Sequence, residues 1–383
     1  MRKQGWTYKK LGEICNTING LWKGKKPPFV RVGVIRNANF TKEFTLRFDN
    51  VEFLDVEERQ FTKRKLQKGD LIVEKSGGST KQPVGRAVLF EKEDGDFSFS
   101  NFTSVLRIKD KKELLYQFLY KYLLFSYKRG DTLTMQKATT GIHNIEFDKF
   151  LGIDIPVPPM EEQGRIVARL DAAFAQIDEL RANAEKQLEE ARALFNAALN
   201  EEMKPKKGWE DCTLGDVCDL MAGGDVPKNR FSKKKNELYK VPIYSNGVIN
   251  EGLYGYTDIP KITKNCITIS GRGTIGFVVK RTEPFFPVIR LIVAIPKDGL
   301  DVSYLRYCVI SKRFERNGAA IPQLTVPMIK NVVIPIPTLN EQRAIVERLD
   351  GLSERVKELE EIARTTVKEC DALKQSILRE TFE

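Results

Sequence analysis

Two segments, IPVPPMEEQGRIVARLD (Ile155 to Asp171) and IPIPTLNEQRAIVERLD (Ile334 to Asp350), repeat nearly the same sequence within one chain. In both, each proline moves the residue before it away from the helical conformation, which is typical of an extended strand. A Glu-Gln pair follows, and after it the apolar residues take up helical spacing. We therefore predict that each copy is a strand that leads directly into a long helix.

The helical parts keep an unbroken alternation of four and three residues between apolar positions, which is the seam pattern of a coiled coil. The second seam consists of Ile345, Leu349, Leu352, Val356, Leu359, Ala363, Thr366, Cys370, Leu373 and Ile377. The first seam consists of Ile166, Leu170, Ala173, Ile177, Leu180, Ala184, Gln187, Ala191, Leu194 and Ala198. Gln187 and Thr366 are both the seventh residue of their seams. A polar residue at this position either fixes the pairing register of the helices or is merely tolerated. Because neither helix can cover its apolar stripe alone, we expect the two to pair antiparallel.

A second repeated motif opens each half of the chain. GWTYKKLGEIC (Gly5 to Cys15) returns as GWEDCTLGDVC (Gly208 to Cys218), whereas the sequences between these frames differ. We expect Trp6 and Trp209 to anchor cores. The predicted order is a block (1–154), a helix (155–203), a block (204–333) and a helix (334–383). The predicted fold class is α+β, with two mixed α/β domains separated by the paired helices in a pseudo-twofold repeat.

Composition excludes several classes of protein. The chain has 383 residues, of which 41% are hydrophobic and 30% charged, so more than one globular domain is expected. No stretch approaches the roughly 18 consecutive apolar residues of a membrane span, and Met1 to Gly5 lacks the apolar run of a signal peptide. We expect a cytoplasmic protein without a membrane partner. Six scattered cysteines and one histidine argue against a zinc site, a disulfide framework and histidine catalysis, so we expect no metal and buried, reduced thiols.

The net charge of +11 is divided unevenly along the chain. Basic and acidic residues number 29 and 19 in 1–154, 5 and 10 in 155–203, 21 and 12 in 204–333, and 8 and 11 in 334–383, which gives +10, −5, +9 and −3. A polyanion should therefore bind the blocks rather than the helices. From Ile166 to Ala198 a helix rises roughly 50 Å at about 1.5 Å per residue. That length corresponds to about 15 base pairs of DNA at about 3.4 Å each.

Three short motifs suggest enzymes, but their context does not fit. KPPF (Lys26 to Phe29) is similar to the loop with which an amino-methyltransferase holds its base, but that loop begins with an amide or an acid. Lys26 stands at this position instead, so the segment is interpreted as a turn. GRGTIG (Gly271 to Gly276) is followed by strand-forming residues rather than a helix, and it therefore favours a hairpin turn over a dinucleotide site. DLIVEK (Asp70 to Lys75) has nuclease-like residues with the wrong spacing in what should be a buried strand.

The candidate DNA contacts are polar and basic residues in glycine-containing loops of the two blocks, where side chains can reach base edges and phosphates. In the first block they are Lys23, Lys25, Lys26, Arg31, Ser76, Ser79, Lys81, Gln82, Arg86, Gln136, Lys137, Thr139, Thr140 and His143. In the second block they are Lys228, Asn229, Arg230, Lys233, Ser245, Asn246, Ser270, Arg272, Thr274, Arg316 and Gln323.

The repeated G-W-x(4)-L-G opening and the repeated Pro-x-Pro-x-x-x-E-Q-x-x-I-V-x-R-L-D helix start resemble the specificity subunits of type I restriction–modification systems. The likeness spans essentially the whole chain. It implies two target-recognition domains, each reading one half of a bipartite double-stranded DNA sequence, and two helices that set the spacing. It also implies docking to two modification (methyltransferase) subunits and to restriction (motor-nuclease) subunits. The resemblance implies that S-adenosylmethionine, ATP and Mg are bound by those partners and that this chain has no cofactor and no active site of its own.

Three other functions remain open at this point. The chain could serve a fused methyltransferase–nuclease polypeptide, it could be a regulator that binds bipartite DNA without enzyme partners, or it could be a structural coiled-coil scaffold. The regulator leaves the helix-start motif unexplained, and the scaffold leaves the two basic blocks unexplained.

Overall fold

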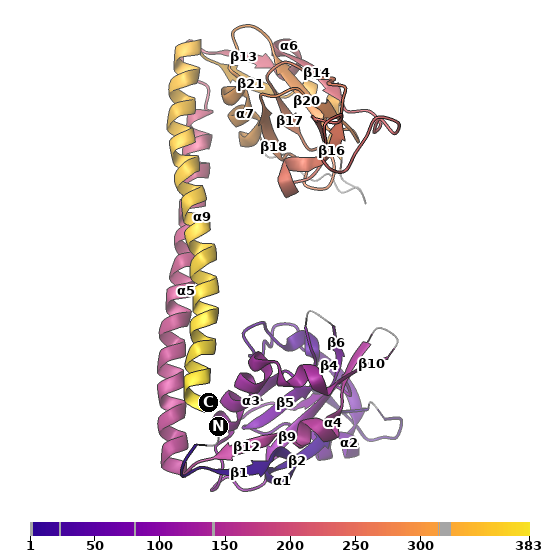
Figure 1. The fold of residues 1–383 in the computed structure, drawn as a ribbon, viewed down its shortest axis with the longest axis vertical. Coiled ribbons are helices and arrows are strands. Elements are labelled where there is room, and N and C mark those ends of the chain that lie inside the picture. The colour runs from indigo at the N-terminus through magenta and orange to yellow at the C-terminus, as the bar shows by residue number, and fades with distance from the viewer. Residues whose placement is uncertain (1–2, 23, 80–81, 140–141, 313, 315–322) are drawn as a thin grey trace. The chain divides into compact units, whose positions relative to one another are not determined.

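The computed structural model describes residues 3–22, 24–79, 82–139, 142–312, 314 and 323–383. Its contacts divide the chain into two compact units (Figure 1). The first unit comprises Met1–Ala182 and Thr365–Glu383, and the second comprises Asn183–Arg364. Each unit therefore contains one of the basic blocks together with a part of both long helices.

The two predicted long helices are present as α5 (Met160–Glu202) and α9 (Leu339–Phe382). Within each unit their segments run antiparallel, because residues later in α5 contact residues earlier in α9. The pairs of the first unit are Arg169 with Thr381, at 2.9 Å, and Asp178 with Lys374, at 2.5 Å. The pairs of the second unit are Arg192 with Glu360, at 2.7 Å, and Glu202 with Arg348, at 2.9 Å. The predicted antiparallel pairing is therefore confirmed in each unit.

The first unit is a mixed domain of small sheets and helices. Thirteen strands and helices form its frame and they are β1 (Thr7–Lys10), α1 (Leu11–Ile14), β2 (Cys15–Asn19), β3 (Phe29–Ile35), β4 (Glu52–Glu57), α2 (Glu58–Arg64), β5 (Asp70–Glu74), β7 (Ala87–Phe90), β8 (Phe97–Phe99), β9 (Thr103–Ile108), α3 (Tyr116–Arg129), α4 (Phe147–Leu151) and β12 (Asp154–Val157). The sheets are β2-β9-β5-β7, β4-β3-β8 and β1-β12. All five residues of β5 are buried, as expected for a central strand of apolar, β-branched residues.

The second unit has the same frame in the same order, except that no helix of its described residues corresponds to α2. Its elements are β13 (Glu210–Thr213), α6 (Leu214–Val217), β14 (Cys218–Ala222), β15 (Val241–Tyr244), β16 (Leu253–Thr257), β17 (Cys266–Ile269), β18 (Val278–Arg281), β19 (Phe286–Pro287), β20 (Ile292–Pro296), α7 (Val302–Ser311), α8 (Val326–Lys330) and β21 (Val333–Ile336). The sheets β14-β20-β17-β18, β16-β15-β19 and β13-β21 correspond one to one with those of the first unit. Even the single parallel pairs match, since β3 pairs with β8 and β15 with β19. The predicted fold class and internal repeat are thus confirmed.

The repeated glutamine explains how each domain is attached to its helix. Gln163 is completely buried, and its Nε2 donates to the carbonyl oxygens of Glu113 and Pro158, each at 2.8 Å. Its Oε1 accepts from the backbone N–H of Leu115 at 2.8 Å. One side chain thereby joins the loop before α3 to the turn that begins α5, with its buried polar atoms paired.

Gln342 repeats this arrangement in the second unit. It is also completely buried, and its Nε2 donates to the carbonyl oxygens of Gly299 and Pro337, each at 2.9 Å. Its Oε1 accepts from the backbone N–H of Asp301 at 2.8 Å. The glutamines thus make three equivalent bonds each, and we call each set a glutamine clamp.

Around each clamp, the first turns of the helix complete the core of the domain. Ile166, Leu170 and Phe174 belong to the same buried cluster as Phe118 and Phe125 of α3. In the second unit Ile345 and Leu349 join the cluster of Tyr304 and Tyr307 of α7. Trp6 and Trp209 are half-buried against these two cores, as predicted. The Trp209 indole donates from Nε1 to Glu341 at 3.2 Å.

The seam prediction is wrong at three leucines. Leu180, Leu194 and Leu373 were expected to be covered, but their exposed fractions are 56%, 63% and 50%. Gln187 is exposed as well, which favours a tolerated polar residue over one that fixes the register. The physical reason is that a single partner helix covers a seam residue from one side only.

The cysteines carry free thiols, five of them buried and Cys212 half-buried. Burial raises the pKa of the thiols of Cys15, Cys218, Cys266 and Cys308 to about 12, so these groups stay protonated and unreactive at neutral pH. Within the described ranges, no helix combines the length and apolar character that a membrane span requires.

We predict that replacing the first clamp glutamine, Gln163→Leu, lowers the free energy of unfolding by roughly 3 kcal/mol or more, since each buried group left unpaired costs about 1–3 kcal/mol. Thermal unfolding of the intact chain, together with hydrogen exchange of the Leu115 amide, measures the effect. Gln187→Leu is the matched control because Gln187 is exposed on the same helix. Equal stability of the two variants would contradict the clamp.

Candidate nucleic-acid interface

Two candidate loops of the first unit come together in one small sheet. The segments Ser76 to Arg86 and Met135 to Asn144 were predicted to be turns and loops, but they contribute β6 (Ser76–Gly78), β10 (Gln136–Thr139) and β11 (Ile142–Ile145). These strands form a sheet in the order β10-β11-β6. The loop prediction is therefore wrong for these strands, although the segments do adjoin each other.

Several candidate side chains of this sheet are held by local hydrogen bonds. The Gln136 Oε1 atom accepts from the backbone N–H of Val84 at 3.3 Å and lies 3.3 Å from the His143 Nδ1 atom. Ser79 Oγ accepts from the backbone N–H of Gln82 at 3.1 Å. Such bonds order the loop, and the Gln82 side chain remains exposed.

The basic loop before β3 carries further candidates. Lys25 and Lys26 are exposed in a bend that ends at Pro27 and Pro28, as the interpretation of KPPF as a turn predicts. Arg31 is exposed on β3 and pairs with Asp55 at 3.3 Å. An exposed pair of this kind contributes about 0–1 kcal/mol and can exchange its partner for a phosphate. Lys137 is also exposed.

Arg86 has a structural role instead of the predicted contact role. Its side chain is only 9% exposed, and Nε donates to Glu74 Oε2 at 2.7 Å while NH2 donates to Oε1 at 3.2 Å. The guanidinium also lies over the Phe40 ring, 5.5 Å from its centroid. A bidentate buried pair is costly to break, because the remaining charge would be left unpaired. Arg86 therefore closes the base of the loop after β5.

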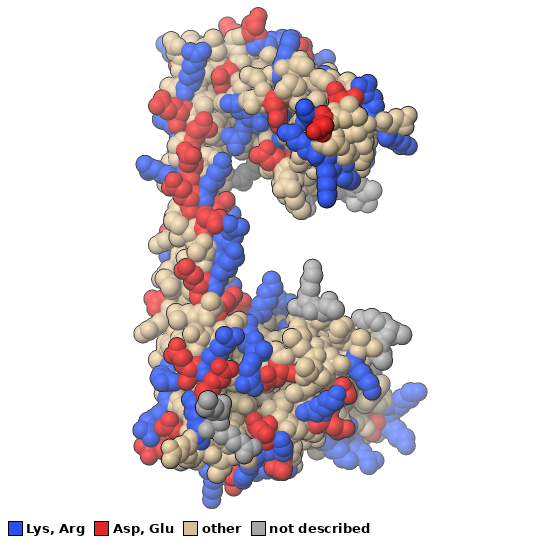
Figure 2. Space-filling model, viewed as in Figure 1, with Lys and Arg blue, Asp and Glu red and all other residues tan. Residues whose placement is uncertain are grey.

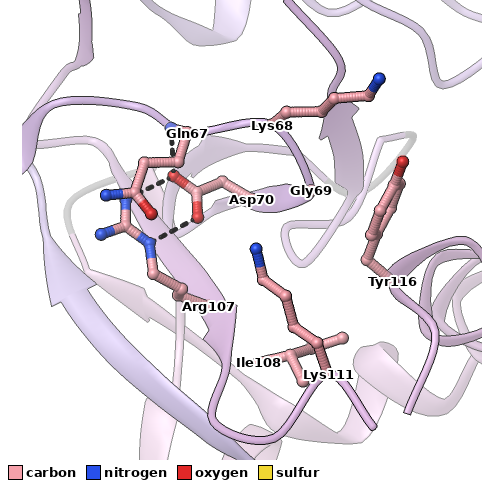
Figure 3. A pocket seen from close by; sticks show the side chains of 8 residues that line it. All are labelled: Gln67, Lys68, Gly69, Asp70, Arg107, Ile108, Lys111 and Tyr116. Carbon is pink, nitrogen blue, oxygen red and sulfur yellow. Dashed lines mark hydrogen bonds and ion pairs between the residues drawn. The ribbon is translucent and has the colours of Figure 1, made fainter. Parts of the chain in front are cut away.

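The acids of DLIVEK are both neutralised by arginines. Asp70 is 1% exposed and accepts from Arg107 Nε and NH2, both at 2.7 Å, as Figure 3 shows beside the small cavity near Gln67. Glu74, at the other end of β5, is held by Arg86. Asp70 and Glu74 are four residue steps apart on the strand, which places their backbone positions about 13 Å from each other. At this separation they cannot bind one metal ion, as the spacing of the motif predicts.

The candidates of the second unit come from four loops: Lys228 to Lys235, Tyr244 to Asn250, Ser270 to Thr274 and Arg316 to Gln323. Described residues of the last three loops contact one another. Asn246, in the turn after β15, accepts from the backbone N–H of Gly271 at Oδ1 (2.8 Å) and donates from Nδ2 to the Ile289 carbonyl (2.5 Å). Arg272 NH2 donates to Gln323 Oε1 at 3.4 Å. The Gly271 to Gly276 turn joins the antiparallel strands β17 and β18, so the hairpin prediction for GRGTIG is confirmed.

Within this cluster, exposure differs among the predicted contacts. Arg272, Thr274 and Gln323 are exposed, and Ser245 is half-buried with Oγ donating to the Gly252 carbonyl at 3.4 Å. Ser270 is only 2% exposed, so its side chain packs inside the domain rather than facing a ligand. Its position directly after the buried strand β17 explains this correction.

The loop Lys228 to Lys235 lies against β16. Arg230 Nε donates to Asp258 Oδ1 at 2.8 Å, and Lys233 Nζ donates to the Tyr254 carbonyl at 3.2 Å while lying 3.8 Å from the centroid of that tyrosine's ring. Lys228 and Asn229 are exposed. The loop is thus a cationic edge stabilised by an ion pair and a cation–π contact.

Four predicted contacts, Lys23, Lys81, Thr140 and Arg316, lie outside the described residues. Thr139 is placed only as a backbone position of β10. These five residues remain candidates on sequence grounds alone.

Sequence reasoning missed Asn37 and Lys75 in the first unit. Asn37 donates from Nδ2 to the Ser76 carbonyl at 2.7 Å, and Lys75 donates from Nζ to Asn19 Oδ1 at 3.1 Å. Burial lowers the pKa of Lys75 below its ordinary value. A signal for Asn37 exists, since VIRN (Val34 to Asn37) and IYSN (Ile243 to Asn246) both place an asparagine two residues after an apolar strand.

The surface charge is mixed on the visible face of both units. Figure 2 shows Lys and Arg spread among Asp and Glu on this face, over the domains as well as the long helices. On this face, charge alone therefore does not distinguish the candidate contacts from the rest of the surface.

Comparison with known proteins identifies the family. The model described as the type I restriction modification DNA specificity domain matches residues 3–190 and again residues 206–368. A protein of Mycoplasma pneumoniae named as a type I specificity subunit is 30% identical over 272 residues, which cover 68% of this chain and 79% of that protein. The StySPI specificity subunit of Salmonella potsdam is 22% identical over 99% of this chain and 89% of its own length.

Solved structures share the fold. A chain of a type I R-M system matches with a TM-score of 0.79 at 22% identity and covers 100% of this chain and 99% of that one. The HsdS subunit of Thermoanaerobacter tengcongensis matches with a TM-score of 0.54 at 22% identity, covering 99% of this chain and 97% of that one. Because the family model matches two regions that together cover most of the sequence, this chain belongs to the type I restriction–modification DNA specificity subunits.

Proposed function

We propose that this chain is the DNA-reading subunit of a type I enzyme and that each domain recognises one half of a bipartite sequence in double-stranded DNA. The carrying observation is that two domains with the same strand order present different loops at equivalent positions. One frame with unlike loops is suited to reading two unlike sequences, because the frame fixes the position of the loops and their side chains determine specificity.

The catalytic steps belong, in this proposal, to partner subunits. Two methyltransferase subunits would bind S-adenosylmethionine and modify adenine, and motor-nuclease subunits would use ATP and Mg to translocate and cut. Two ion pairs at β5 support the assignment of catalysis to other subunits, because Arg107 pairs with Asp70 and Arg86 pairs with Glu74. Each carboxylate is thus neutralised by an arginine of the same domain, so the two ion pairs stabilise the fold and leave no free carboxylate for catalysis at this strand.

Exposed apolar residues on the long helices suggest where the methyltransferase subunits dock. In the first unit these are Leu180 and Leu373, 56% and 50% exposed. In the second unit they are Leu194 and Ile362, 63% and 58% exposed. Large apolar side chains in water cost free energy, and helix faces that keep them are suited to binding further helices.

The length of α5 and α9 would set the number of base pairs between the half-sites. Each helix is unbroken over more than forty residues, 43 in α5 and 44 in α9, and a helix resists shortening because its hydrogen bonds fix its rise per residue. This proposal makes the helices a spacer whose length is independent of the loops that read the bases.

We predict that deleting this gene in its host removes one bipartite adenine-methylation motif from the genome, since recognition would be lost while the partner genes remain intact. Single-molecule methylation sequencing measures the motif before and after deletion. Reintroducing the native gene is the control and should restore the same motif. An unchanged methylome, in a host whose partner genes are expressed, would contradict the proposed function.

A second prediction concerns the spacer. Inserting one heptad after Gln187 and one after Thr366 keeps the seam in phase and lengthens both helices by about 10 Å, or about three base pairs. The methylated motif should then show a gap longer by about three base pairs and unchanged half-sites. A heptad in α5 alone is the control, because unmatched lengths prevent continuous pairing. Altered half-sites with an unchanged gap would be inconsistent with a spacer.

A further inference from the structure

An asparagine ties the same two loops together in both domains. Asn37 and Asn246 each lie two residues after the last residue of β3 or β15, which are equivalent central strands. Asn37 donates to the Ser76 carbonyl at 2.7 Å, and Asn246 accepts from the Gly271 N–H at 2.8 Å. Both bonds reach the chain that leaves β5 or β17. Because both ends of the Asn246 amide are engaged, this residue positions the loops and has little left to offer a base.

In each domain a third chain segment, the one that follows β8 or β19, lies beside the two loops joined by the asparagine. In the first unit, Leu21 bridges Ser100, and the Phe102 carbonyl accepts from the N–H groups of Lys75 and Ser76 at 2.9 and 3.2 Å. Phe102 lies two residues after Ser100. Its backbone is held by these hydrogen bonds, while its side chain is 49% exposed.

In the second unit, Gly224 bridges Val288, so Arg290 is the residue two positions after the bridge. Its backbone N–H donates to the Gly223 carbonyl at 3.0 Å, and that of Ile289 donates to the Gly224 carbonyl at 2.8 Å. Arg290 is exposed. Phe102 and Arg290 therefore occupy the same position in the two domains with entirely different side chains.

Backbone strain is concentrated around this position in the second unit. Among the described residues, five other than glycine have positive φ, and four of them lie in the loop after β15, which contains Asn246, or in the segment after β19, whose Ile289 carbonyl accepts from Asn246. They are Asn250 (46°), Glu251 (52°), Ile289 (52°) and Arg290 (60°). Positive φ is unusual for a β-branched residue such as isoleucine. Strain of this kind persists where surrounding contacts enforce it, and it clusters at binding sites.

A buried arginine enforces part of this strain. Arg281 is 4% exposed, and its guanidinium donates to the Glu251 carbonyl at 2.5 Å and to Glu251 Oε2 at 3.1 Å. It also stacks over the Tyr244 ring, 3.6 Å from its centroid. Tyr244 belongs to a buried hydrophobic cluster, so the Arg281 guanidinium joins this core to the loop that carries Glu251 and holds that loop in a fixed shape.

We propose that Phe102 and Arg290 are base-reading residues of the two domains, Phe102 by apolar contact with a thymine methyl group and Arg290 by paired hydrogen bonds to the edge of a guanine. This inference rests on the proposed function. Readout of a base needs a side chain whose backbone is fixed, and both residues meet that condition. The planar guanidinium matches guanine O6 and N7, and an aromatic ring matches the methyl group that distinguishes thymine.

The test uses the complete enzyme with its methyltransferase subunits. Methylation rates are measured on the cognate duplex and on duplexes with one base pair changed at each position of either half-site. Arg290→Ala should reduce discrimination at one G·C pair of the half-site read by the second domain by about tenfold or more. Phe102→Ala should do the same at one T·A pair of the other half-site. For the native enzyme, uracil in place of that thymine should reproduce the effect.

Two exposed residues away from this position serve as controls. Phe53→Ala removes a phenylalanine that is also 49% exposed, on β4, and Lys264→Ala removes a cation near the opposite end of β17. Neither should alter discrimination at any position. Arg290→Gln and Phe102→Gln extend the test if an alanine variant fails to fold. Each keeps a long side chain but removes the guanidinium or the apolar ring, so each should still lose discrimination at the same pair.

The outcomes separate the two hypotheses. A uniform fall in rate on all duplexes, or unchanged discrimination in a folded variant, would overturn the inference and leave the proposed function in place. A native enzyme that methylates no bipartite sequence would instead overturn the proposed function itself.

Discussion

A buried glutamine at the start of each long helix is the constraint on which the rest of this molecule depends. A primary amide removed from water is stable only if its donor and acceptor groups are paired, and Gln163 and Gln342 achieve this with three bonds each to backbone groups. Those backbone groups belong to two different segments. The amide therefore fixes the angle at which a domain meets its helix, and the Pro-x-Pro strand before it cannot shift without leaving polar groups unpaired.

Once each domain is fixed on its helix, the loops far from the clamp can vary without loss of the fold. The repeated strand order shows how much of each domain is frame, and the unlike loops show how much is free to change. Asn37 and Asn246 preserve one junction within this variation, because both tie the end of a central strand to the loop that follows its neighbour. The two domains thus place these loops at the same position in the frame, while the side chains that the loops carry differ.

The parts that were predictable from the sequence are those governed by periodicity and repetition. The long helices followed from seam spacing, the paired frames from repeated motifs, and the GRGTIG hairpin from strand-forming residues after the turn. The strands β6, β10 and β11 were missed because they are short and polar, without the alternation that marks a half-buried strand. Burial of Arg86 was equally hidden, since its partner Glu74 lies twelve residues away across a loop and only the folded chain brings them together. Three leucines were placed in the seam although spacing alone cannot say how completely a partner covers them.

The most direct test of the account measures how rigidly a domain is held on its helix. Spin labels at Asp94 and Glu179, two exposed positions of the first unit, report that relation by double electron–electron resonance in a chain with Cys212→Ser. The account predicts one narrow distance distribution for the native clamp and a broad one when Gln163 is replaced by leucine. A broad distribution in the native chain, or the same narrow one in both, would contradict it.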